Sequence, residues 1–193
     1  MNKKLILAIF AFIVIAAIAA VLYFKDFKRS VKNENNFKII QIKNINMKIL
    51  SPAFEHNSSI PAKYTCDGDN INPALQISEV PETSKSLVLI VDDPDATRGY
   101  AWLHWTVWNI APETKEIAEN SAPTNAVEGK TDFGTVGYGG PCPPSKTHRY
   151  FFKLFALDIV LNLPAGASLQ DLEKAMEGHI LAQSELMGLY NRE

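Results

Sequence analysis

The sequence predicts a mainly β protein, an antiparallel sandwich that carries one helix near its C-terminus. Several short segments are continuously apolar or alternate between apolar and polar residues, and clusters of Gly, Pro, Asn and Asp separate them. This is typical of strands joined by turns. One segment has the apolar spacing of a helix. The chain lacks the regular alternation of strands and helices that predicts a parallel sheet.

Five segments carry the strand pattern. The run from residue 86 is rich in β-branched residues and leucine and ends abruptly at an acidic loop, whereas the run from residue 104 alternates large apolar and polar side chains. Both patterns are typical of buried or half-buried strands. The predicted strands are residues 47–50, 74–78, 86–91, 104–110 and 150–157, and residues 110–138 are expected to form long surface loops.

Only one segment has a helical period, and Ser168 can cap it. Its apolar residues recur at spacings of three, four and seven, which gives a single stripe; they are Leu169, Leu172, Met176, Ile180 and Met187. Gly178 lies inside this stripe, so the pattern allows one kinked helix or two short helices. His179 is interpreted as a helix-surface or core-edge residue, because nothing near it in the sequence supplies a partner.

The N-terminus predicts a membrane segment. Residues 5–24 are uncharged and almost wholly apolar, which is long enough for a helix to cross a bilayer. Ala17-Ile18-Ala19 resembles a cleavage site, so residues 1–24 are either a signal anchor or a signal peptide. Residues 25–46 form a linker, and residues 47–193 form the domain. We expect that domain to be membrane-anchored outside the cytoplasm, or secreted or periplasmic after cleavage.

The charge distribution argues against nucleic acid as a partner. Residues 1–48 hold nine of the 19 Lys and Arg residues and two of the 21 Asp and Glu residues, which leaves ten basic against 19 acidic residues in 49–193. The domain therefore has a formal charge of −9 and would repel a phosphate backbone over most of its surface.

Acidic and imidazole side chains gather at the predicted strand ends. Asp93 follows one strand and His104 begins the next, so an antiparallel pairing would bring them together. A Gly- and Pro-rich loop leads to His148, Arg149 and Tyr150 at the start of another strand. Two cysteines, Cys66 and Cys142, lie in turn-rich sequence. In an exported domain they predict one disulfide, with two free buried thiols as the alternative.

Several short motifs follow one another in a fixed order over about residues 51–190. They are Tyr64-Thr-Cys-Asp-Gly, Asn72-Pro-Ala-Leu, Asp93-Pro-Asp-Ala, Trp102 with His104, Asp132-Phe-Gly, Gly140-Pro141, His148-Arg-Tyr150 and Gly178-His with Met187-Gly-Leu-Tyr190. This ordered set resembles the phosphatidylethanolamine-binding protein family, in particular its bacterial and archaeal Raf kinase inhibitor-like branch. Family members usually have proline where this chain has Thr97, so the loop after Asp95 departs from the pattern.

The resemblance implies two antiparallel sheets in Greek-key order with a small cavity at one edge. It implies a ligand site made by Asp93, Trp102, His104, Gly140, Pro141, His148 and Tyr150. In that site Asp93 would hold a histidine ring and raise its pKa, and Gly140 could bring backbone N–H groups close to a ligand. Two imidazoles with a net proton between them suit a small anion such as phosphate, sulfate or a carboxylate, so affinity should fall as pH rises. Trp102 is the expected rim residue, and Arg149 should point to the opposite face.

The expected function is that of a non-catalytic binding protein for a small anion or phospholipid head group, without a cofactor or metal. The family is associated with inhibition of kinases or proteases, which makes such an enzyme a candidate partner. The alternative is a hydrolase that uses His104, His148 and Asp93, either with a metal ion or with Cys142 or Ser145 as nucleophile.

Overall fold

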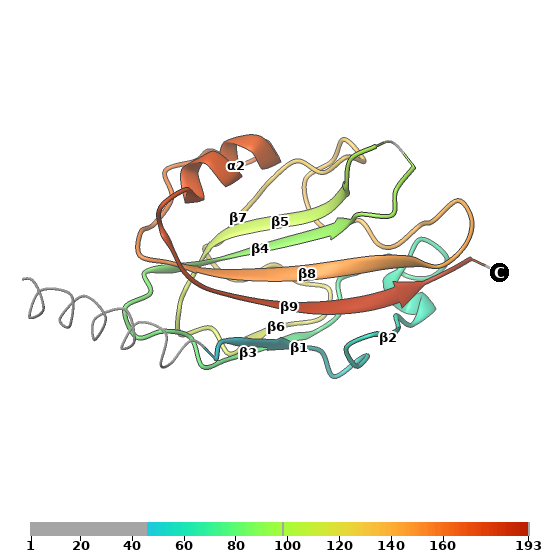
Figure 1. The fold of residues 1–193 in the computed structure, drawn as a ribbon, viewed down its shortest axis with the longest axis horizontal. Coiled ribbons are helices and arrows are strands. Elements are labelled where there is room, and N and C mark those ends of the chain that lie inside the picture. The colour runs from blue at the N-terminus through green and yellow to red at the C-terminus, as the bar shows by residue number, and fades with distance from the viewer. Residues whose placement is uncertain (1–45, 98, 193) are drawn as a thin grey trace, which may run out of the picture. The chain divides into compact units, whose positions relative to one another are not determined.

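The structure is a computed structural model that describes residues 46–97 and 99–192 (Figure 1). The predicted signal anchor or signal peptide and almost all of the predicted linker lie outside these residues. Within the described residues, no helix is both long and apolar enough to cross a membrane.

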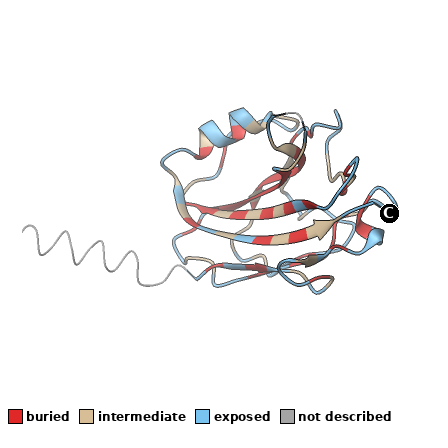
Figure 2. Cartoon of the chain, turned by 45° about the vertical axis from the view of Figure 1, so that its right-hand side comes forward, coloured by how far each residue is buried: buried red, intermediate tan, exposed pale blue. Residues whose placement is uncertain are grey.

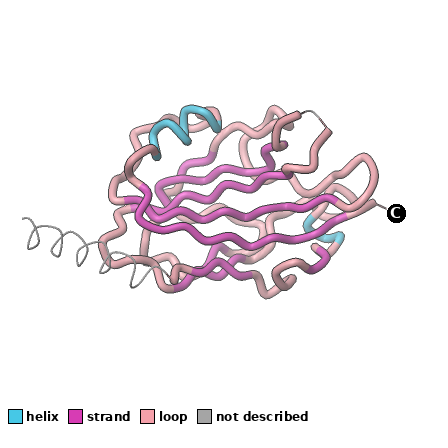
Figure 3. The backbone as a smooth tube through the Cα atoms, viewed as in Figure 1, coloured by secondary structure: helices cyan, strands magenta, loops and turns pink. Residues whose placement is uncertain are grey.

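The described chain is built mainly of strands, with one short α-helix (Figure 3). In chain order the elements are β1 (Lys48–Leu50), β2 (Ser58–Ser59), the 3-10 helix η1 (Ala62–Tyr64), β3 (Leu75–Ser78), β4 (Ser86–Asp93), β5 (Trp102–Ile110), β6 (Glu116–Ile117), β7 (Val127–Glu128), β8 (His148–Leu157), α2 (Leu169–Met176) and β9 (Ile180–Tyr190). All five predicted strands are present, and β4, β5 and β8 are each two residues longer than predicted.

Two sheets form, as predicted. The small sheet has the order β1-β3-β6 and the large sheet the order β2-β9-β8-β4-β5-β7. Within the large sheet, β8 returns to lie beside β4, so β8-β4-β5-β7 is a Greek-key order. The connection from β5 to β7 includes β6, which belongs to the small sheet. All neighbouring strands pair antiparallel except the short contact of β2 with β9, which is parallel.

Strand β4 is the centre of the packing because all eight of its residues are buried. Leu87, Leu89 and Val91 belong to the main core, which includes residues of both sheets, whereas Val88 and Ile90 pack in a second cluster with residues of α2. This explains why the segment reads as a continuous apolar run, since a strand covered on both faces needs no polar alternation. The neighbouring β8 instead alternates buried and partly exposed residues (Figure 2).

The predicted helix is shorter than its apolar stripe. Ser168 does cap α2, with its side chain accepting a hydrogen bond from the Asp171 N–H. The helix ends at Met176, and Gly178 adopts φ +77°, a conformation that glycine reaches easily.

The extension of this helix to Ile180 and Met187 was wrong, because residues 180–190 form the long strand β9 (Figure 3). The interpretation that His179 has no partner was also wrong, since its Nδ1 lies 2.8 Å from Oδ1 of Asp158.

Candidate functional site

Three strands of the large sheet bring the acidic and imidazole residues to one end of the sheet. The register pairs Asp93 of β4 with Trp102 of β5, and Asp92 with Phe151 of β8. The end of β4 therefore lies between the start of β5 and the start of β8. This confirms the predicted antiparallel pairing and the proximity of Asp93 to His104, since both residues line the same cavity.

A β-bulge in β5 turns His104 toward this cavity. Val91 pairs with Trp105 while the next residue of β4, Asp92, pairs with Leu103, so His104 is the extra residue on β5. Trp105 belongs to the core that includes both sheets, and Leu103 packs on the α2 side. In a regular strand His104 would point away from Trp105. The bulge re-aims the side chain, a use of bulges that is common next to functional sites.

The cavity has a volume of about 260 Å³. It combines one carboxylate and two imidazoles with aromatic, proline and small side chains; its lining residues are Asp93, Ala96, Thr97, Trp102, His104, Phe133, Cys142, Pro143, Pro144 and His148. A polar cluster in a mostly apolar concave site is typical of a site for a small molecule. Thr97, at the position where the family usually has proline, is part of the wall.

Asp93 and His148 form a buried pair. Asp93 Oδ2 lies 2.7 Å from His148 Nδ1, and only 4 % of Asp93 and 6 % of His148 is exposed. The second oxygen of Asp93 accepts a hydrogen bond of 2.8 Å from the Asp95 N–H. The carboxylate therefore orients the His148 ring, and its charge can stabilise a proton on that ring. The family resemblance implied such a contact between Asp93 and a histidine ring, and His148 is that histidine.

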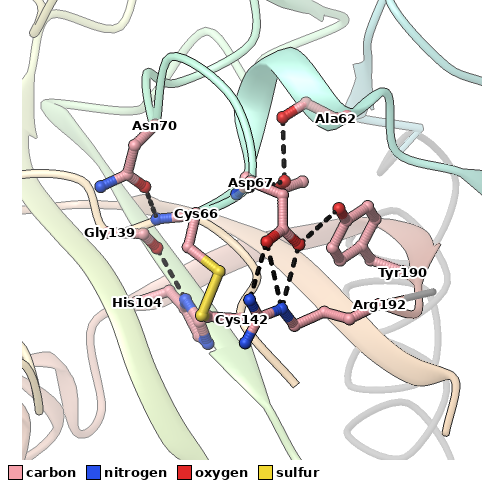
Figure 4. The surroundings of a disulfide bond; sticks show 11 residues. Ala62, Cys66, Asp67, Asn70, His104, Gly139, Cys142, Tyr190 and Arg192 are labelled. Atoms are coloured by element: carbon pink, nitrogen blue, oxygen red, sulfur yellow. Dashed lines mark hydrogen bonds and ion pairs between the residues drawn. A yellow bond between two sulfur atoms is a disulfide. The ribbon is translucent and has the colours of Figure 1, made fainter. Parts of the chain in front are cut away.

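His104 is held by the backbone instead. Its Nδ1 lies 2.6 Å from the Gly139 carbonyl oxygen (Figure 4). Burial lowers the pKa of His104, and this effect outweighs the Gly139 carbonyl and the Asp93 carboxylate, which both raise it. His104 is therefore neutral at neutral pH, and a net proton shared by the two imidazoles would not reside on this ring.

Tyr150 lies beneath the cavity and does not line it. Its ring meets the His104 ring edge-on, with centroids 5.2 Å apart. Burial, followed by the Asp93 carboxylate, raises the pKa of Tyr150, so this residue is a neutral phenol at physiological pH. Its contact with the cavity is through His104.

Gly140 and Pro141 lie behind the cavity wall. The Gly140 N–H donates a hydrogen bond of 2.7 Å to Asn70 Oδ1 and is not turned to a ligand, which corrects the expected role of this backbone group. A side chain at Gly140 would also lie 2.5 Å from the Tyr64 carbonyl oxygen, so glycine is required by close packing. The Pro141 carbonyl accepts a hydrogen bond from the Cys66 N–H.

The predicted disulfide joins Cys66 to Cys142, with Cα atoms 5.4 Å apart (Figure 4). Because Cys142 lines the cavity, this bond ties the cavity wall to the loop that contains Cys66. No described cysteine is free. A thiol nucleophile at Cys142, part of the hydrolase alternative, is therefore absent in this oxidised state, and Ser145 is not among the lining residues.

The tryptophans of β5 and Arg149 of β8 lie where the sequence predicted them. Trp102 lies at the cavity, whereas Trp105 and Trp108 are buried in the two core clusters. Arg149 makes an ion pair with Asp95 and is exposed, as expected for a residue on the opposite face. Sequence reasoning missed Phe133, whose ring packs edge-on against Trp102 and His104. Its place in the motif Asp132-Phe-Gly was the only signal for it.

Among the described residues, no group of three or more His, Cys, Asp or Glu side chains is arranged to hold a metal ion. In the cavity, the Nδ1 of each histidine is hydrogen-bonded to a carboxylate or a carbonyl, and the oxygens of Asp93 contact His148 and the Asp95 N–H.

The chain is similar to proteins of a known family. Residues 50–191 match the model of the phosphatidylethanolamine-binding protein family. A UPF0098 protein from Methanothermobacter thermautotrophicus is 50 % identical over 151 residues, which cover 76 % of this chain and 99 % of that protein.

Two solved structures are also similar. A phosphatidylethanolamine-binding protein homologue from Chlamydia trachomatis is 43 % identical with a TM-score of 0.74 over 77 % of this chain and 99 % of that one. E. coli YbcL, described as a member of the mammalian family, is 31 % identical with a TM-score of 0.72 over 76 % of this chain and 99 % of its own. The chain therefore belongs to the phosphatidylethanolamine-binding protein family.

Proposed function

We propose that this chain is a non-catalytic binding protein whose cavity receives a small anion, either free phosphate or the phosphate of a phospholipid head group. The observation that carries the proposal is the arrangement of the two cavity histidines. Each has its Nδ1 anchored, His148 by Asp93 and His104 by the Gly139 carbonyl, so that Nε2 is the ring nitrogen left for a ligand.

The charges of the site support an anion. When His148 is protonated, Asp93 balances its charge at Nδ1, and the N–H at Nε2 is left as a donor for the ligand. A charge-assisted hydrogen bond from this group in a buried site is stronger than one between neutral groups. The size of the cavity, about 260 Å³, suits a tetrahedral oxyanion or a head group.

The hydrolase alternative has less support. Cys142 is oxidised, and Ser145 is not among the residues that line the cavity. Inhibition of a kinase or protease stays a prediction from the family resemblance. Membrane attachment through the N-terminal segment stays a prediction from the sequence.

Titration calorimetry with inorganic phosphate tests the proposal, with phosphoethanolamine as a second ligand to represent the head group. His148→Ala should weaken phosphate binding by about ten- to a hundredfold, because it removes a charge-assisted hydrogen bond of roughly 1.5 to 3 kcal/mol. His179→Ala is the matched control, since His179 pairs with Asp158 and does not line the cavity. Added salt should also weaken binding. Unchanged affinity in His148→Ala would place the anion elsewhere and reject the proposal.

A further inference from the structure

The hydrogen bond between His104 and Gly139 determines which ring nitrogen carries the proton. A backbone carbonyl can only accept, so Nδ1, 2.6 Å from the Gly139 oxygen, must donate and must carry the hydrogen. In the neutral ring Nε2 is then a lone-pair acceptor. Only 3 % of His104 is exposed, and burial disfavours the charged ring that would turn Nε2 into a donor.

The groups around His104 do not change its preference for the neutral ring. Asp93 and Asp132 both raise the pKa of His104, and so do the backbone contacts with Gly139 and Gly140, yet burial outweighs them and the pKa is lowered overall. Tyr150, which touches the ring edge-on, is a neutral phenol. His148, across the same cavity, is paired with Asp93. An anion that enters therefore meets an acceptor at Nε2 of the neutral His104 and, when His148 is protonated, a donor at Nε2 of His148.

We propose that His104 makes the cavity selective for an oxyanion that carries its own proton, as hydrogen phosphate does. The inference rests on the proposed function, because it requires an anion in the cavity. The hydroxyl of hydrogen phosphate can donate to His104 Nε2 while an unprotonated oxygen accepts from His148. Sulfate has no proton to donate, so one of its oxygens would face the Nε2 lone pair. The phosphodiester of a phospholipid also has no proton on its phosphate, so the site favours free phosphate over that head group.

Sulfate and phosphate form a matched pair of ligands for the test. Near neutral pH both are tetrahedral oxyanions of similar size, but phosphate carries at least one proton and sulfate carries none. Calorimetry should give an affinity for phosphate at least about tenfold higher than for sulfate, because a site built for a donor leaves a buried acceptor unpaired when the donor is missing. Dimethyl phosphate, which represents the phospholipid diester, should also bind more weakly than phosphate.

The matched variants are His104→Gln and His179→Gln. A glutamine amide at position 104 can present either a donor or an acceptor, so the ratio of phosphate to sulfate affinity should fall toward one. The same change at His179, outside the cavity, should leave the ratio as it is in the wild type. As pH falls, the affinity of the wild type for sulfate should rise, because protonation converts Nε2 of His104 into a donor. The affinity of His104→Gln for sulfate should rise less over the same pH range, because glutamine does not titrate.

The outcomes separate the two claims. If neither anion binds, the proposed function fails and the selectivity fails with it. If sulfate or dimethyl phosphate binds as tightly as phosphate, the anion site stands and the selectivity is rejected. If His104→Gln keeps the wild-type ratio of phosphate to sulfate affinity, the role of His104 is also rejected.

Discussion

The two histidines of the cavity differ in the group that holds their Nδ1 atoms, and this difference controls their chemistry. His148 faces the Asp93 carboxylate, which can stabilise a positive ring, whereas His104 faces the neutral Gly139 carbonyl in a buried position. The sequence motifs place both residues at the site. They do not show this division of roles, because the partner of His104 is a backbone oxygen 35 residues away in the chain.

The lowered pKa of His104 predicts how stability depends on pH. In the unfolded chain His104 has an ordinary pKa near 6.5, above its pKa in the folded protein. The unfolded state therefore takes up a proton first as pH falls, and the contribution of His104 to stability is lost as pH drops through about 6.5. In phosphate-free buffer, lowering the pH from about 7.5 to about 5.5 should reduce the unfolding free energy of His104→Gln less than that of the wild type.

Urea unfolding at several pH values measures this difference. The informative quantity is the slope of the unfolding free energy against pH, which should be smaller in His104→Gln. Equal slopes in the wild type and His104→Gln would mean that burial does not hold the His104 ring neutral.

At the scale of elements, one wall of the cavity is held by a second segment of the chain. The loop after η1 contacts the segment before β8 through the disulfide between Cys66 and Cys142 and through three hydrogen bonds. The Gly140 N–H donates to Asn70, the Cys66 N–H donates to Pro141, and the Tyr138 hydroxyl donates to the Tyr64 carbonyl. The covalent link and the polar contacts thus position Cys142 at the cavity.

Removal of the disulfide should destabilise the domain and leave its fold intact. The bond closes a loop with a sequence separation of 76 residues, so the double variant Cys66→Ser, Cys142→Ser should lose about 2 to 5 kcal/mol of unfolding free energy. Denaturant unfolding measures the loss, and a thiol reductant should destabilise the wild type but not the double variant. Intact mass should rise by two hydrogens on reduction of the wild type. Maleimide labelling of the folded, unreduced protein would contradict the bond.

The elements also show where sequence reasoning succeeds and where it fails. Strand β4 was predicted because residues 87–91 are continuously apolar, which is the pattern of a strand buried on both faces. Strand β9 was missed because its core-facing positions include the small residues Ala182 and Gly188, which leave no apolar alternation, while Ile180 and Met187 continue the spacing of α2 by coincidence.

The β-bulge at His104 could not be predicted either. It depends on the register between two strands, with Val91 opposite Trp105 and Asp92 opposite Leu103. The family motif identified His104, Asp93, His148 and Trp102 as residues of the cavity. Pattern alone could not show that Gly140 is turned to Asn70, since that contact joins residues 70 positions apart.

For the whole molecule, the central claim is that one end of a Greek-key sheet holds an anion between two differently anchored histidines. The chain contains four histidines, and two of them, His56 and His179, do not line the cavity. NMR of the domain with ¹⁵N-labelled histidine, titrated with inorganic phosphate, tests the claim most directly. We predict that the Nε2 signals of His104 and His148 shift together and saturate, while those of His56 and His179 stay fixed. Unchanged signals for both cavity histidines, or saturable shifts confined to His56 or His179, would contradict the account.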